Sequence, residues 1–137
     1  MNFTNLAQYI IESNTLGLIE DIIIAGIGKM KAKTDTGNEA YNVLHGVNIK
    51  VEDDFVVFNC ESGNRVKLPL KETIKVHYGK GNVDDRPVAL CDCVINGKKY
   101  FKVPFSITDR SSNSYKVLLG QDFIKFNGGM VNINKAD

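Results

Sequence analysis

The chain has 137 residues, which is the size of one domain and leaves little room for a second. Its 17 basic and 16 acidic residues give a formal charge of +1, and this balance argues against a nucleic acid or an anionic membrane as a partner. No apolar run reaches the roughly 18 residues of a membrane span, the N-terminus lacks the pattern of a signal peptide, and three cysteines do not suit a secreted disulfide framework. We therefore expect an intracellular protein of the reducing cytoplasm.

The N-terminal residues predict one short helix. Residues 4–13 place apolar side chains at helical spacing, and Thr4 is available as an N-cap. We expect this helix to belong to an N-terminal extension of residues 1–17, which either covers one end of a barrel or binds a partner. Beyond it the pattern changes to strands, so residues 18–137 are expected to form the main domain.

Short strands joined by tight turns fill the rest of the chain. Residues 19–28 are rich in isoleucine, residues 29–37 begin with alternating polar and apolar side chains, and Gly26 and Gly28 predict a hairpin turn between the two. This many short strands predict a mainly β fold, a small barrel or a sandwich. Residues 121–126 look helical again. Further strands are predicted over residues 46–52, 55–60, 65–70, 73–78, 87–95, 99–107, 116–120 and 130–134.

An acidic residue follows the second predicted strand in the sequence Asp35-Thr36-Gly37. A strand gives the Asp35 carboxylate a fixed direction, the Thr36 hydroxyl can form a local hydrogen bond, and Gly37 lets the backbone turn tightly. The tripeptide alone is also typical of an ordinary turn with an Asx-type hydrogen bond. A second motif is needed to distinguish a catalytic loop from a turn.

That second motif lies late in the chain, where Leu118, Leu119 and Gly120 precede the predicted helix. An Asp-Thr-Gly loop followed by an apolar-apolar-Gly strand and a short helix resembles the retropepsin-like aspartic proteases. The resemblance implies that Leu118, Leu119 and Gly120 pass beside the Asp35 loop. It also implies that these residues support the active site together with Thr36 and Gly37.

More narrowly, the chain resembles the RimK-associated or ATP-dependent zinc proteases, whose fold is that of the acid proteases. The resemblance covers roughly residues 19–134. It implies a small closed β-barrel of the retropepsin-like acid protease type, with a short N-terminal helix and a short helix after Gly120. The motifs that carry it, in order, are "AKTDTG" at 32–37, Leu44-His45-Gly46 where the family has Leu-His-Ala, Arg86-Pro87-Val88, Thr108-Asp109-Arg110 and Leu118-Leu119-Gly120.

The family's chemistry implies a homodimeric aspartic endopeptidase with a role in processing or maturation. Hydrolysis by this route needs two carboxylates that share one proton and a water, because like charges about 3 Å apart cannot both ionise. The chain holds one Asp-Thr-Gly, so the pair would consist of Asp35 from each subunit. The implied partners are a protein or peptide substrate and a second copy of the chain, with no cofactor.

A hairpin that closes over the substrate is also expected, because it would exclude water from the cleft. The first candidate for this flap has its tip at Tyr78, Gly79, Lys80, Gly81 and Asn82, where the glycines favour mobility. Residues 61–64 are the second candidate.

The sequence contains no ligand pattern typical of a zinc site, although the family name mentions the metal. The chain lacks His-Glu-x-x-His, and its two histidines are His45 and His77. Cys91 and Cys93, with Cys60 or a histidine, are either zinc ligands or buried packing residues. We predict no metal, and we expect His45 to be structural near the active-site loop.

Two departures from the family keep other functions open. Asn38 stands where the family usually has Ala, and Gln121 stands where it has an Arg that braces the active site or dimer. Arg110 or Arg86 would be the substitute brace. The alternatives are a non-catalytic protease-like module that binds peptides or dimerises, and a monomeric barrel that acts as an adaptor.

Overall fold

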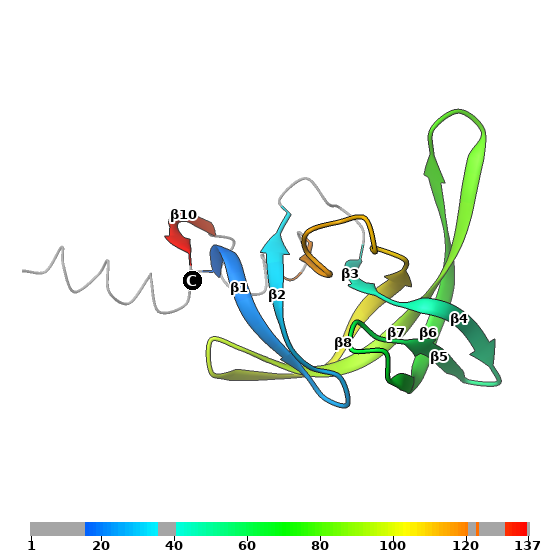
Figure 1. Cartoon of the computed structure of the whole chain (residues 1–137), viewed down its shortest axis with the longest axis horizontal. Helices are drawn as coiled ribbons and strands as arrows, with labels where there is room; N and C mark the ends of the chain where they lie inside the picture. The colour runs from blue at the N-terminus through cyan, green and yellow to red at the C-terminus, as the bar shows by residue number, and fades with distance from the viewer. Residues whose placement is uncertain (1–15, 36–40, 121–122, 124–130, 137) are drawn as a thin grey trace, which may run out of the picture.

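The computed structural model describes residues 16–35, 41–120, 123 and 131–136. Over these residues the chain forms a single sheet whose strands curl around one core (Figure 1). The strands are β1 (Leu16–Ile24), β2 (Gly28–Thr34), β3 (Asn42–His45), β4 (Val47–Glu52), β5 (Phe55–Asn59), β6 (Arg65–Tyr78), β7 (Asn82–Ile95), β8 (Lys98–Thr108), β9 (Val117–Leu119) and β10 (Val131–Ala136).

Six of these strands close into a barrel in the order β1-β2-β9-β3-β8-β7. The closing contact is the antiparallel pairing of β1 with β7, from Ile22↔Ile95 to Ile24↔Cys93. Strands β6, β5 and β4 continue the sheet beyond β7, and β10 pairs in parallel with β1. The prediction of a mainly β fold with a small closed barrel is therefore confirmed.

The core includes the inside of the barrel, where alternate residues of most strands face inward. On β1, Ile22 and Ile24 are buried while Ile23 between them is 48% exposed. Phe105 on β8 and Phe58 on β5, a strand outside the barrel, belong to the same buried cluster, and both are at 0% exposure. Each such aromatic or aliphatic side chain contributes about 1.5–3 kcal/mol on burial.

Several predicted strands have other bounds in the structure: β1 covers Leu16–Ile24 where 19–28 was predicted, and β7 begins at Asn82 where residue 87 was predicted. Two larger differences concern β6 and β3. The expected strands 65–70 and 73–78 are one continuous strand, β6, because a bulge between Leu70 and Glu72 carries the pairing past the polar residues in between. Strand β3 was not predicted, since its four residues are all buried and do not alternate. The helix expected at 4–13 lies outside the described residues, and of residues 121–126 only Phe123 is described.

The hairpin of β6 and β7 extends beyond the barrel (Figure 1). In its outer half, from Glu72 to Arg86, the described side chains are exposed or half-buried. The part of the chain that the structure describes contains no helix long and apolar enough to cross a membrane.

Candidate functional site

Asp35 lies directly after β2, at the end of the barrel where β2 and β9 finish side by side. These two strands run in parallel, with Lys33 beside Leu118 and Thr34 beside Leu119. The backbone N–H of Asp35 donates a hydrogen bond to the carbonyl of Leu119 at 2.8 Å. The structure thus brings Asp35 and the Leu118–Gly120 run together, whereas Thr36 and Gly37 lie outside the described residues.

Asn42, on β3, forms a side-chain hydrogen bond at the same end of β9. Its Oδ1 accepts a hydrogen bond from the backbone N–H of Gly120 at 2.8 Å, and its Nδ2 donates to the carbonyl of Pro104 at 3.2 Å. Asn42 is only 6% exposed. The sequence analysis did not select this residue, although an amide side chain next to the apolar Val43 and Leu44 was a signal of a buried polar contact.

Arg110 is the basic residue whose charge interacts with Asp35. Burial lowers the pKa of the Arg110 guanidinium, the nearby charge of Arg86 lowers it further, and the negative charge of Asp35 opposes both. The Arg110 Nε–H donates to the carbonyl of Tyr115 at 2.9 Å, just before β9. Of the two candidate braces, Arg86 pairs with Asp84 at 2.9 Å, and Arg110 carries the interaction with Asp35.

His45 connects β3 to the segment that holds Arg110. It is 5% exposed, and its Nδ1 accepts a hydrogen bond from the backbone N–H of Arg110 at 2.8 Å. Two carboxylates lie near the ring, Glu61 at 3.6 Å from Nε2 and Asp109 at 3.8 Å from Nδ1. Two hydrogen bonds from Ser111 lower the pKa of Asp109, burial opposes them, and the charges of His45 and Lys116 lower the pKa further.

The first flap candidate is the tip of the β6–β7 hairpin. Tyr78 pairs with Asn82, and the turn between them is formed by Gly79, Lys80 and Gly81. Gly79 and Gly81 have φ values of 57° and 74°, a left-handed conformation that suits glycine. Residues 61–64, the second candidate, lie in the turn between β5 and β6.

No group of three or more potential metal ligands comes together among the described residues. Cys91 and Cys93 are buried free thiols on β7. Burial, with the charges of neighbouring residues, raises the pKa of Cys91 to about 12 and that of Cys93 to about 11. Both therefore remain protonated thiols at neutral pH.

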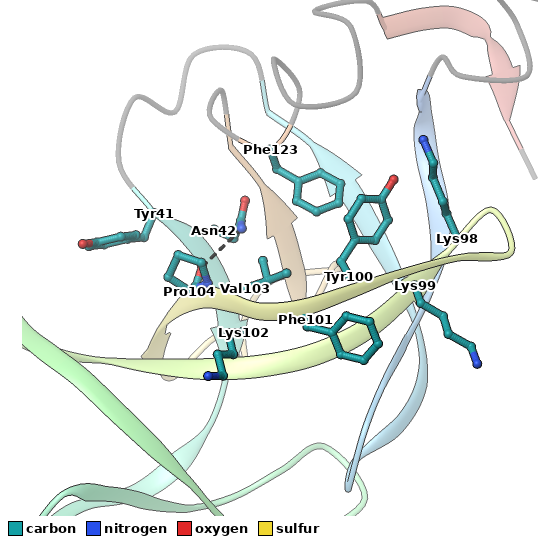
Figure 2. Close-up of a pocket in the computed structure, with 10 residues that line it drawn as sticks. All are labelled: Tyr41, Asn42, Lys98, Lys99, Tyr100, Phe101, Lys102, Val103, Pro104 and Phe123. Atoms are coloured by element: carbon teal, nitrogen blue, oxygen red, sulfur yellow. Dashed lines mark hydrogen bonds between the residues drawn. The ribbon is translucent and has the colours of Figure 1, made fainter.

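A groove of about 600 Å³ adjoins Asn42 along the first half of β8. Figure 2 shows Tyr100 and Phe123 beside one another on one side of the strand, and their rings meet edge to face with centroids 5.0 Å apart. Tyr41 and Pro104 line the end of the groove near Asn42. The groove therefore shares a residue with the Asp35 site and offers mainly apolar and aromatic contacts.

A β-bulge shapes the strand that lines this groove. Phe101 and Lys102 together lie opposite Asp92, whose Oδ1 accepts the backbone N–H of Lys102 at 2.9 Å. Lys102 has a φ of 53°, which costs a non-glycine residue about 1 kcal/mol. The bulge leaves Phe101 71% exposed at the groove.

Comparison with known proteins supports the fold of the chain. No protein-family model and no curated protein matches it. Among solved structures it resembles a Legionella pneumophila protein of unknown function (DUF785), with a TM-score of 0.72, 24% identity, and coverage of 89% of this chain and 95% of that one. At this identity the likeness concerns the fold alone.

Proposed function

We propose that the protein is a retropepsin-like aspartic endopeptidase that hydrolyses peptide bonds through Asp35. The observation that carries the proposal is the junction of β2 and β9, where the backbone of Asp35 is hydrogen-bonded to Leu119. A carboxylate at the end of a paired strand is held in one direction, as a general base must be. Asp35 is also half-buried, so its carboxylate is not fully surrounded by water.

The chemistry requires a second carboxylate, which a homodimer would supply as Asp35 of the other subunit. One carboxylate accepts a proton from the attacking water, and its protonated partner polarises the carbonyl of the scissile bond. Thr36 and Gly37 are the proposed supports of this loop, and the β6–β7 hairpin is the proposed flap. The proposed substrate is an extended peptide segment of a protein.

The experiment compares wild-type protein with Asp35→Asn on a library of unmodified peptides, with cleavage read by mass spectrometry. Asp35→Asn keeps the size of the side chain and removes its ability to act as a base, so we expect cleavage to disappear while the unfolding temperature changes little. Asp54→Asn is the matched control, since Asp54 lies in the exposed turn between β4 and β5. Unchanged cleavage by Asp35→Asn would refute the proposal.

The second candidate function is a non-catalytic module that binds peptides. The groove beside Asn42 favours it, because about 600 Å³ of mainly aromatic and apolar surface can hold side chains without any chemistry. In the same library experiment this candidate gives peptides that are bound and recovered intact by both wild-type protein and Asp35→Asn. Sedimentation then distinguishes a dimer from a monomeric adaptor.

A further inference from the structure

One peptide group links Asp35 to Asn42. The carbonyl of Leu119 accepts the N–H of Asp35, and the N–H of Gly120 donates to Asn42 Oδ1, both at 2.8 Å. The carbonyl of Leu119 and the N–H of Gly120 belong to the same peptide bond. Because a peptide bond is planar, the direction of its N–H also determines the direction of its C=O.

The side chain of Asn42 suits this contact because it offers an acceptor and a donor at once. The partner of Oδ1 is a backbone N–H and the partner of Nδ2 is a backbone C=O, so only one orientation of the amide satisfies both. The donor bond ties Asn42 to Pro104 on β8, and Figure 2 shows this bond as a dashed line. The amide cannot rotate without leaving a buried backbone group unsatisfied.

The backbone of Asn42 is held as well. Its carbonyl accepts a hydrogen bond from the hydroxyl of Ser106 at 3.3 Å, and β3 is paired on both sides, with β8 and with β9. Asn42, Ser106, Leu119 and Gly120 are all buried. Losing the contact at Gly120 would leave a buried backbone N–H without its acceptor, which is costly.

We propose that Asn42 is a positioning residue for Asp35, which orients the Leu119–Gly120 peptide group and through it the backbone of the proposed catalytic carboxylate. This inference rests on the proposed function for its consequence in catalysis. The hydrogen-bonded relay itself is a property of the fold. The two are therefore tested by different measurements.

The first measurement uses NMR to compare amide hydrogen-exchange rates in Asn42→Leu and in wild-type protein. Leucine fills similar space without a donor or an acceptor. We expect the amides of Gly120 and Asp35 to exchange about tenfold faster, the equivalent of one hydrogen bond each. The amide of Ile22 on β1, a strand that pairs with neither β3 nor β9, should keep its rate. Ser106→Ala is the control, because it removes a bond to the backbone of Asn42 and leaves the side-chain amide intact.

The second measurement is the pH dependence of peptide cleavage by Asn42→Asp. A protonated aspartic acid can still donate to Pro104 and accept from Gly120, whereas the ionised carboxylate turns an acceptor toward the Pro104 carbonyl. We expect the activity of the variant relative to wild type to be near one in acid and to fall by about 100-fold as the new carboxyl ionises, mainly in kcat. The charged and polar groups around the site are the same in both proteins, so the activity is compared as a ratio to wild type; they are Asp35, Tyr41 with Lys71 and Glu72, and Lys98, Lys99 and Lys102.

Each outcome decides one question. Unchanged exchange at Asp35 in Asn42→Leu, with faster exchange at Gly120, overturns the positioning role whatever the activity. A uniform rise in exchange at all amides also overturns it, since it indicates general destabilisation. If Asn42→Leu does not fold, Asn42→Asp decides, and a pH-independent ratio refutes the proposal. If wild-type protein cleaves no peptide, the proposed function fails, and the exchange of Asn42→Leu and of Asn42→Asp across the pH range still tests the relay.

Discussion

Gly46→Ala is expected to destabilise the protein, although the RimK-associated proteases that the sequence resembles have alanine at this position. Gly46 is buried just after β3, and its φ is not in the left-handed region, so backbone strain does not require glycine there. A Cβ at this position would lie 2.6 Å from Ile107 Cγ2 and 2.6 Å from Phe58 Cδ2. Carbon atoms in contact normally lie about 3.5–4.0 Å apart. The substitution therefore places one methyl group where two core side chains already are.

The expected loss is the difference between two effects. Adding volume to a packed core costs about 1–3 kcal/mol, and neither Phe58 nor Ile107 can move into solvent, since they are 0% and 1% exposed. Replacing glycine lowers the entropy of the unfolded chain, which stabilises the protein by about 0.4–1 kcal/mol. The net loss is about 1–2 kcal/mol, which for a chain of this length lowers the Tm by about 4–7 °C.

Urea and thermal unfolding of a double-mutant cycle measure this loss. The variants are Gly46→Ala, Phe58→Leu and the two combined. Phe58→Leu alone loses packing, but the smaller side chain can turn away from the new methyl group. The combined variant is therefore expected to be more stable than the sum of the single losses by about 1 kcal/mol. Additive losses, or a Gly46→Ala protein at least as stable as wild type, would show that the core accommodates the methyl group and that the steric argument is wrong.

Two further predictions follow from buried groups outside the Asp35 loop. His45→Leu leaves the backbone N–H of Arg110 without its acceptor, and we expect the free energy of unfolding in urea to fall by about 1–3 kcal/mol. His45→Asn keeps an acceptor near the Nδ1 position and should lose less. Equal losses would contradict the role of the Nδ1 contact. At pH 8 the raised pKa values leave roughly 10⁻⁴ of Cys91 and 10⁻³ of Cys93 as thiolate, so iodoacetamide should label both in native protein at least about 100-fold more slowly than in unfolded protein, as read by mass spectrometry. Fast labelling of native protein would show that this part of β7 opens readily.

The strands that were predicted well are those whose two faces have different surroundings. On β2 one face packs on the core and the other meets water, so alternation in the sequence reports the strand directly, whereas β1 was recognised by its isoleucine content. Strand β3 lacks this contrast, because all four of its side chains are buried. Periodicity could not reveal it.

Strand β6 shows the opposite error. The polar pair Lys71-Glu72 was left between two predicted strands, yet the chain continues through it as one strand. The bulge between Leu70 and Glu72 absorbs the irregularity, and β7 continues to pair on either side of it. The partner strand, which is distant in the sequence at this point, decides that the strand continues.

Some features of the candidate site were predicted from the sequence, and others are visible only in the folded structure. The Asp-Thr-Gly run and the Leu-Leu-Gly run were recognisable as motifs, and their adjacency was expected from the resemblance. The hydrogen bond of Asn42 to Gly120 was not, because it joins residues 78 positions apart through a side chain that belongs to no motif. Likewise, only the folded barrel brings the charge of Arg110 to bear on Asp35.

The sequence by itself determined the β class, most of the strands and the position of the acidic loop, because these depend on side-chain alternation and turn residues within a few positions of one another. The tertiary structure decided the closure of β1 on β7, the place of β9 between β2 and β3, and the contacts that hold Asp35 and His45. Those contacts depend on the register between distant strands. That register is set by how the whole core packs, and no local stretch of the sequence carries it.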